Sequence, residues 1–252
     1  MARRVLLSFM GVAALAAIAV AAAMLPGADV PAAAHAGTAG TIHGTVQYSG
    51  TAPQPAVLQM AADPYCVTAH AGQTVLSEQL VVNDNNTVRW TFLHLSAAGS
   101  GALPAGPAET VELDQVGCMY QPHVLGMQAG ATIRVVNSDQ TLHNVNAQPR
   151  NNRAFNVAQP IPGMAIERTF ENPEIMVPVR CDVHPWMQAF VGVVPHNFFA
   201  VSGEDGSFSL DGVPPGDYVL EAWHESLGTQ TMNVTVRDGE ATTADFTFGS
   251  DQ

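Results

Sequence analysis

Short segments in which apolar and polar residues alternate recur along the chain. The clearest are TIHGTVQYSG at 41–50, TVRWTFLHL at 87–95, ATIRVVN at 131–137, SFSLDG at 207–212, DYVLEAW at 217–223 and MNVTVRDG at 232–239. Alternation with a period of two is typical of strands buried on one face, and Gly, Pro, Asn and Asp at the segment ends favour turns. No segment has the apolar period of an amphipathic helix of useful length. The pattern therefore predicts an all-β fold of the sandwich type.

Composition divides the chain after residue 36 into three parts. Residues 37–105 start with strand signals and end in the linker-like SAAGSGALPAGPAE. Residues 106–195 contain two of the three cysteines and half of the ten methionines. Residues 196–252 carry the turn signals EDG and PPGD between alternating strands, and they are too few for a large core, so we expect them to pack on the middle part. The segment 87–95 fits either the sheet of the middle part or a sandwich with the last part.

Residues 1–36 have the pattern of a secretory signal peptide. Arg3 and Arg4 precede an apolar run, and small residues follow, with Ala34-His35-Ala36 as the expected cleavage site. The run from 5 to 25 is also long enough to span a bilayer as an uncleaved anchor. We expect cleavage, because the run is rich in alanine and ends in an A-x-A pattern. This places the protein in the periplasm or outside the cell.

The charge balance is strongly acidic. The chain has no lysine, and its nine arginines stand against 22 carboxylates, which gives a formal net charge of −13. Such a surface repels nucleic acid and anionic lipid and favours cationic partners or solubility. We therefore expect no nucleic-acid binding, and no membrane association beyond the N-terminal segment.

The cysteine count becomes informative if the protein is exported, because disulfides persist outside the cytoplasm. The three cysteines are Cys66, Cys118 and Cys181, so at least one is unpaired or otherwise engaged. If Cys66 pairs with Cys118, the free one is Cys181. A second metal site made by Cys118 and His123 is an alternative, but the compartment favours the disulfide.

Cys181 begins a cluster of residues that suits a soft metal. In CDVHPWM, a thiolate, an imidazole and a thioether follow each other at steps of three residues, at Cys181, His184 and Met187. A copper site that transfers one electron uses two imidazoles, a thiolate and a weak axial thioether. His143, in NSDQTLHNVNAQ, supplies the second imidazole. Since so short a spacing cannot converge on an extended strand, these residues are expected on a loop, which Pro185 helps to fix.

The stretch from MYQPHVLGMQAGATIRVVNSDQTLHNV to CDVHPWMQAFVGVV resembles the cupredoxins, the blue copper proteins that include plastocyanin, pseudoazurin and amicyanin. The spacing Cys-x-x-His-x-x-Met, with proline after the histidine, is similar to the loop of amicyanin. The resemblance implies a Greek-key cupredoxin β-sandwich over 106–195, with one type 1 copper held by His143, Cys181, His184 and Met187. It also implies that Asn144 steadies the loops and hydrogen-bonds near the sulfur.

The resemblance further implies that His184 lies near the surface, so that redox partners dock near His184, Pro185 and Trp186. The sequence departs from the family before the cysteine, where it reads IMVPVRC. A cation at Arg180 is expected to favour the thiolate form of Cys181.

The last part, with its G-x-F-x-L and PPG-x-Y patterns, resembles the carboxypeptidase regulatory-like (transthyretin-like) β-sandwich modules of exported proteins. Chains that combine the two modules resemble methylamine-utilisation proteins, for which electron transfer from an amine dehydrogenase is implied.

The sequence thus predicts an exported mononuclear type 1 copper protein that carries single electrons and is not an enzyme. Phosphate-binding loops, the G-x-S-x-G motif and the H-E-x-x-H motif are absent from the sequence. Two alternatives stay open. The first is a periplasmic copper-binding or delivery protein that uses the same ligands, and the second is a metal-free structural β-sandwich protein.

Overall fold

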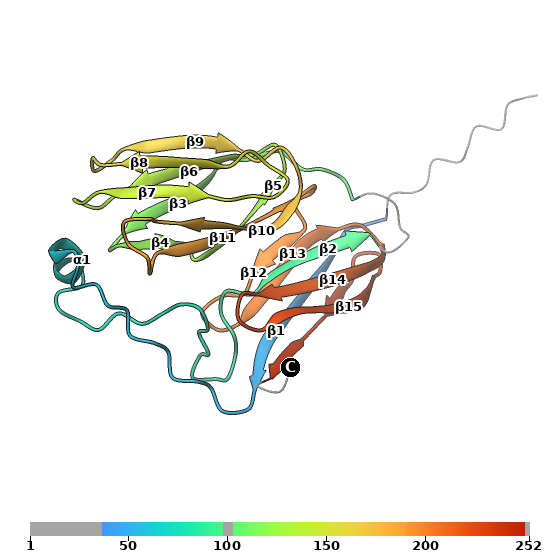
Figure 1. Ribbon diagram of the computed structural model, residues 1–252. Helices are drawn as coiled ribbons and strands as arrows, with labels where there is room; N and C mark the ends of the chain where they lie inside the picture. The colour runs from blue at the N-terminus through green and yellow to red at the C-terminus, as the bar shows by residue number, and fades with distance from the viewer. Residues whose placement is uncertain (1–36, 98–102, 250–252) are drawn as a thin grey trace, which may run out of the picture. The chain divides into compact units, whose positions relative to one another are not determined.

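The computed structural model describes residues 37–97 and 103–249, and this part of the chain folds almost entirely into strands. It forms two β-sandwiches and a single helix of six residues (Figure 1). The all-β prediction is therefore confirmed. The expected signal peptide and its cleavage site lie outside the described residues. Within the described ranges, no helix is long and apolar enough to cross a membrane.

The first sandwich is built from residues of the middle part. One sheet has the order β5-β11-β10-β7-β8 and the other β4-β3-β6-β9. Their bounds are β3 (Val111–Val116), β4 (Met119–Gln121), β5 (Val124–Gln128), β6 (Thr132–Asn137), β7 (His143–Ala147), β8 (Phe155–Gln159), β9 (Ala165–Thr169), β10 (Glu174–Arg180) and β11 (Gln188–Val194). The sheets share one core, in which Leu113 and Ile133 of the second sheet belong to the same buried cluster as Val177 and Val191 of the first.

The second sandwich combines the first and last parts of the chain. One sheet holds β1 (Gly40–Ser49), β13 (Ser207–Val213), β16 (Ala241–Thr243) and β17 (Phe246–Gly249). The other has the order β12 (Phe199–Val201), β2 (Phe92–Ala97), β14 (Gly216–His224), β15 (Gly228–Val236). The segment 87–95 therefore belongs to this sandwich. The strand begins only at Phe92, because Trp90 has a φ of 67°, and this left-handed conformation is incompatible with an extended strand at that residue.

A long connection between β1 and β2 leaves the second sandwich and reaches the first. Within it, residues 57–76 form a loop whose two ends lie side by side, because the amide of Leu58 donates a hydrogen bond to the carbonyl of Val75. We call residues 57–76 the covering loop. It contains α1 (Pro64–Ala69), whose N-cap is Asp63 and whose first turn begins with proline, as is favourable at a helix start.

A disulfide between Cys66 of α1 and Cys118 fastens the covering loop to the first sandwich. Cys118 lies in the turn between β3 and β4, and in Figure 1 the helix α1 stands beside that end of the sandwich. His70 adds a contact of 2.6 Å from its Nε2 to the carbonyl oxygen of Gly117. The pairing inferred from the odd cysteine count is confirmed, and Cys181 is the free cysteine.

Two glycines of the first sandwich allow aromatic rings to pack closely on it. A Cβ at Gly126 would lie 2.4 Å from a ring atom of Phe199, and a Cβ at Gly192 would lie 2.5 Å from a ring atom of Phe92. Phe92 also belongs to a buried cluster with Val124 of β5. Glycine is needed at both positions, because a side chain would displace the rings.

Candidate metal centre

The loop between β10 and β11 carries Cys181, His184 and Met187. Two backbone hydrogen bonds close it, from the amide of Cys181 to the carbonyl of Met187 (3.2 Å) and from the amide of Met187 to the carbonyl of His184 (2.9 Å). The three side-chain positions are buried, with exposed fractions of 3%, 1% and 0% in chain order. The close spacing in sequence therefore folds into a tight loop whose chemical groups lie inside the protein.

His143 is brought to this loop by strand pairing. It is the first residue of β7, and β7 pairs with β10 so that Asn146 stands opposite Arg180. The start of β7 therefore lies beside the residues that follow β10. The turn before His143 is held by Asn137, whose Nδ2 donates to the carbonyl of Thr141 at 2.9 Å.

The side chains of His143, Cys181 and His184 converge. The two Nδ1 atoms of the histidines are 3.0 Å apart, and the sulfur of Cys181 is 3.8 Å from Nδ1 of His184. Ligand atoms from the three residues all lie within 4.8 Å of one another. Two imidazoles and one thiolate in such a group match the strong donors that a mononuclear copper site requires, so the residues fit that metal.

Met187 reaches the same region through the backbone of the loop. Its side chain is fully buried in the core cluster that also contains Cys181. A buried thioether next to a thiolate suits a weak axial ligand, but it also suits ordinary core packing. Its assignment as a ligand remains a prediction.

Asn144 ties β7 to the loop. Its Oδ1 accepts hydrogen bonds from the amides of Asp182 (2.6 Å) and Val183 (3.3 Å), and it lies 3.5 Å from the sulfur of Cys181. Its Nδ2 donates to Oδ2 of Asp182 at 3.0 Å. One side chain thus holds the residues between Cys181 and His184 in place, which is the kind of support that orients metal ligands.

Asp139 orients the ring of His143 by contacting the nitrogen on the side away from Cys181. Its Oδ2 lies 2.9 Å from Nε2 of His143, and its two oxygens also accept the amides of Gly117 and Cys118. Burial opposes the charged form of His143, but the hydrogen bonds to Asp139 and Cys181 outweigh it and raise the pKa of His143 to about 9. Since Nε2 donates to a carboxylate, Nδ1 is the atom directed at the thiol and at His184.

Cys181 is poised to ionise. Burial raises its pKa, but hydrogen bonds from His143, from His184 and from the backbone amides of Asn144 and His184 outweigh burial and lower the pKa to about 6. Arg180, expected from the sequence to favour the thiolate, is exposed at the end of β10. The imidazoles and amides, which the loop geometry supplies, are the groups that lower this pKa.

Asp63 of the covering loop contacts the other histidine. Its Oδ2 lies 3.1 Å from Nε2 of His184 and accepts the hydroxyl of Thr141 at 2.7 Å. The expectation that His184 lies near the surface is therefore wrong, because only 1% of the residue is exposed. The physical reason is that the covering loop, fastened by its disulfide, lies on the ring edge that was expected to face solvent. Pro185 beside it is exposed.

The alternative second metal site at Cys118 and His123 does not form. The sulfur of Cys118 is in the disulfide and cannot bind a metal. Its proximity to His184, or to Asp139 and His143, therefore does not make a metal site. His123 instead contacts the carbonyl of Gln188 with Nδ1 (3.1 Å), and its Nε2 contacts the carboxylate of Glu225.

The two carboxylates behind the histidines were not identified from the sequence. Asp139 stands four residues before His143 in NSDQTLHN, and that short spacing is a local signal. Asp63 is 121 residues from His184, and the motif Asp-Pro that contains it indicates only a helix start. Its position depends on the disulfide, which fastens α1 to the end of the sandwich that carries His143 and His184.

Comparison with known protein families gives one match, in the last part of the chain. The family model of the carboxypeptidase regulatory-like domain matches residues 185–249. No curated protein matches the sequence.

Solved structures similar to the chain include copper proteins. A Cu-containing nitrite reductase from Thermus scotoductus SA-01 is 25% identical over 39% of this chain and 25% of its own, with a TM-score of 0.31. A purple cupredoxin from Nitrosopumilus maritimus is 25% identical over 32% of this chain and 97% of its own, with a TM-score of 0.29. A mutant of amicyanin in the Cu(I) state is 22% identical over 40% of this chain and 91% of its own, with a TM-score of 0.30. This chain therefore spans a quarter of the nitrite reductase and nearly all of the two smaller proteins.

Proposed function

We propose that this protein binds one copper ion through His143, Cys181 and His184, with Met187 as a weak fourth ligand, and carries single electrons between other proteins. The observation that carries the proposal is the convergence of one thiol and two imidazole Nδ1 atoms in a buried site, with ligand atoms within 4.8 Å of one another. When bound, copper would supply the one-electron couple.

The donor set favours copper over zinc. Structural zinc sites are usually closed by four Cys or His ligands, whereas this group offers one thiolate and two imidazoles. The nearest carboxylates, Asp63 and Asp139, contact the Nε2 atoms of the histidines and face away from the point where the Nδ1 atoms meet. A buried thioether at Met187 suits the softer metal.

The supports of the site suit electron transfer. Asp139, Asp63 and Asn144 each hold a ligand residue or its loop by hydrogen bonds of 3.1 Å or shorter. Such bonds keep the imidazoles and the thiolate in the same arrangement in both oxidation states of the metal. The reorganisation energy of electron transfer is then small. The protein contributes rigidity and a dry surrounding, and we propose no substrate and no enzymatic reaction.

Two exposed apolar residues supply a surface for docking. Leu142, directly before His143, is 41% exposed, and Val183, directly before His184, is 44% exposed. Because redox complexes use small contacts, a modest apolar patch around Leu142, Val183 and Pro185 is sufficient. The formal charge of −13 favours cationic redox partners and argues against nucleic acid or an anionic membrane as a partner.

We propose that the protein works outside the cytoplasm, in the periplasm or in the medium. The disulfide Cys66–Cys118 supports this location, because such bonds are rare in cytoplasmic proteins. The proposal is tested separately by the cleavage of residues 1–36 in the exported protein.

The test of the copper proposal is a titration of the purified chain from Gly37 onward with Cu(II), followed by visible absorption and electron paramagnetic resonance. We expect an intense thiolate-to-copper absorption band and a narrow copper hyperfine splitting, both lost in Cys181→Ser. The proposal fails if the protein stays colourless, or if its copper signal survives in Cys181→Ser. Rapid surrender of the copper to an acceptor protein during redox cycling would favour a delivery function.

A further inference from the structure

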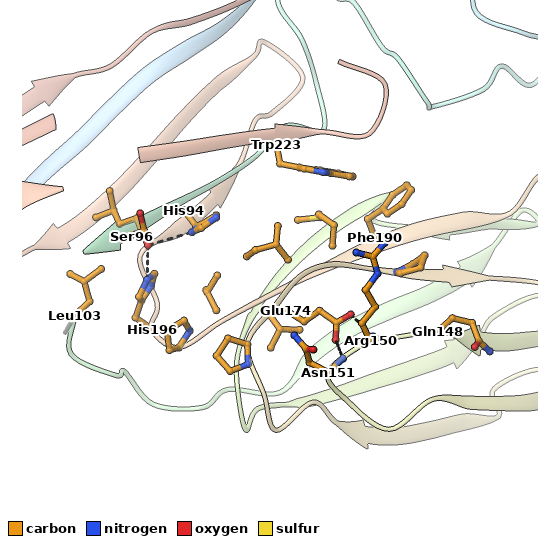
Figure 2. A pocket seen from close by; sticks show the side chains of 18 of the residues that line it. His94, Ser96, Leu103, Gln148, Arg150, Asn151, Glu174, Phe190, His196 and Trp223 are labelled. Carbon is orange, nitrogen blue, oxygen red and sulfur yellow. Dashed lines mark hydrogen bonds between the residues drawn. The ribbon is translucent and has the colours of Figure 1, made fainter. Parts of the chain in front are cut away.

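A large cleft lies away from the metal centre, between β10 and β11 of the first sandwich and β2 and β14 of the second. Its volume is about 1040 Å³, at the upper end of the range for ligand pockets. The first sandwich contributes residues 173–176, Pro178 and Arg180 to the lining, and the second contributes residues 94–96 and Trp223 (Figure 2). Both sandwiches belong to the compact unit formed by residues 36–252.

The base of the cleft is apolar and aromatic. The rings of Phe190 and Trp223 are 5.1 Å apart between centroids, and Figure 2 shows them at the same space from two sides. Both rings are only partly buried, and Ile175 in the wall is 37% exposed. Aromatic and aliphatic side chains left partly open inside a cleft favour an apolar ligand body.

Two arginines that form no ion pair at contact distance with any described carboxylate line this cleft. Among the described residues, Arg89, Arg134 and Arg237 form ion pairs with glutamates. Arg150 and Arg180 line the cleft and are exposed, and within the described part of the chain neither has a carboxylate oxygen within 4.0 Å. Arg150 lies near enough to Glu174 for its charge to help lower the pKa of that carboxyl, but neither guanidinium group is held in a close ion pair by a described carboxylate, so both can bind an anion.

Glu174 and His196, two other polar residues of the cleft, are already engaged in hydrogen bonds. Glu174, the carboxylate among the described lining residues, accepts the amides of Arg150 (2.6 Å) and Asn151 (2.8 Å). His196 contacts the carbonyl of Leu95 with Nε2 and accepts the amide of Phe198 with Nδ1. The positive charge offered to a ligand therefore comes from the two arginines.

We infer that this cleft binds an amphipathic organic anion, with its carboxylate or sulfonate on Arg150 and Arg180 and its apolar or aromatic body on Phe190 and Trp223. The inference rests on the shape and charge of the cleft and does not depend on copper. A neutral apolar molecule would leave the guanidinium groups unused, and a small inorganic anion would leave the aromatic base open to water.

The test compares two fluorescent probes on the metal-free protein. One is the anion 8-anilinonaphthalene-1-sulfonate, and the other is N-phenyl-1-naphthylamine, which has the same rings without the charge. We expect Arg150→Gln/Arg180→Gln to weaken binding of the anion about tenfold or more, as for lost charge-assisted hydrogen bonds, with little effect on the neutral probe. Octanoate should displace the anion from the unaltered protein.

The matched control is Arg134→Gln, which removes an exposed arginine of β6 that pairs with Glu112 outside the cleft. It should leave binding of both probes unchanged. Trp223→Phe should reduce energy transfer from tryptophan to the bound probe, which locates the probe in the cleft. The inference is overturned if the anion does not bind. It is also overturned if the double variant and Arg134→Gln bind the anion equally well, or if the neutral probe depends on the two arginines as strongly as the anion does.

Discussion

Oδ2 of Asp63 lies 3.1 Å from Nε2 of His184, although 121 residues separate them along the chain. This contact makes the covering loop part of the candidate metal centre. Asp63 contacts Nε2 of His184, and the other ring nitrogen, Nδ1, is thereby directed at Cys181, 3.8 Å from its sulfur. Burial raises the pKa of Asp63, but hydrogen bonds from Thr141, Tyr65 and His184 outweigh it and lower the pKa, so the group is a carboxylate at neutral pH.

Replacing Asp63 by alanine should weaken copper binding. Loss of a carboxylate behind a ligating histidine typically lowers metal affinity about 10- to 100-fold. The absorption band should persist, because the ligands remain, and isothermal or competitive copper titration measures the loss of affinity. Asp63→Glu should recover part of it.

The matched control is Asp84→Asn, which removes an exposed carboxylate of the same long connection between β1 and β2. Its affinity for copper should equal that of the unaltered protein. Equal affinity in Asp63→Ala as well would show that the covering loop only shields His184 and does not orient it.

Reduction of the Cys66–Cys118 disulfide should release the covering loop. The two cysteines are 52 residues apart, and cross-linking a chain over that length stabilises the folded state by about 4 kcal/mol in the chain-entropy treatment. Urea unfolding with and without dithiothreitol should show a lower midpoint in the reduced protein. Limited proteolysis should cut first within residues 57–76. Resistance of this loop to proteases after reduction would contradict a cover held by the disulfide.

The proximity of His143, Cys181 and His184 could be predicted from the sequence because the relevant information is local. Cys181, His184 and Met187 lie on one short loop, and His143 follows the clear strand pattern ATIRVVN by six residues, so residue type and spacing indicated this group. Parity requires one unpaired cysteine, and the conditional prediction that Cys181 is free if Cys66 pairs with Cys118 is confirmed.

The environment of His184 could not be predicted because it depends on contacts distant in sequence. Nothing around Asp63 in ADPYC indicates that this turn lies on a histidine in another sandwich. The same holds for the segment 87–95, which has the alternation of a strand from its first residue. Its strand starts only at Phe92, because Trp90 turns with a positive φ. Tertiary packing decides both the burial of His184 and the start of β2, and the periodicity of the sequence carries no information about tertiary packing.

The thiol of Cys181 should titrate well below its ordinary range in the metal-free protein. Its pKa is lowered to about 6, and the absorbance of the thiolate at 240 nm should therefore appear with a midpoint near that pH. His143→Gln should move the midpoint upward, because His143 is the first group that lowers this pKa. A midpoint near 9 in the unaltered protein would contradict the hydrogen bonds described here.

The same shift gives a pH dependence of stability. A thiol whose pKa is lower in the folded than in the unfolded state stabilises the fold at high pH, and this contribution is lost as the pH falls from about 9 through about 6. The free energy of unfolding of the metal-free protein, minus that of Cys181→Ser, should therefore decrease over this interval. Denaturant unfolding at several pH values measures it, and a difference that grows as the pH falls would have the wrong sign.

Met187→Leu should separate the ligand role of Met187 from its packing role. Leucine conserves the apolar volume, so the cost in stability should stay below about 1.5 kcal/mol, as for other volume-conserving core substitutions. If the thioether is the axial ligand, its loss leaves the thiolate and both imidazoles in place. The charge-transfer band should therefore persist while the reduction potential rises, because a weak axial donor stabilises Cu(II) more than Cu(I).

Met127→Leu is the matched control, since Met127 is also fully buried in the same core cluster but lies on β5. Spectroelectrochemistry of the two variants measures the potentials. An unchanged potential in Met187→Leu, or an equal rise in both variants, would assign Met187 to the core alone and leave copper with the thiolate and the two imidazoles.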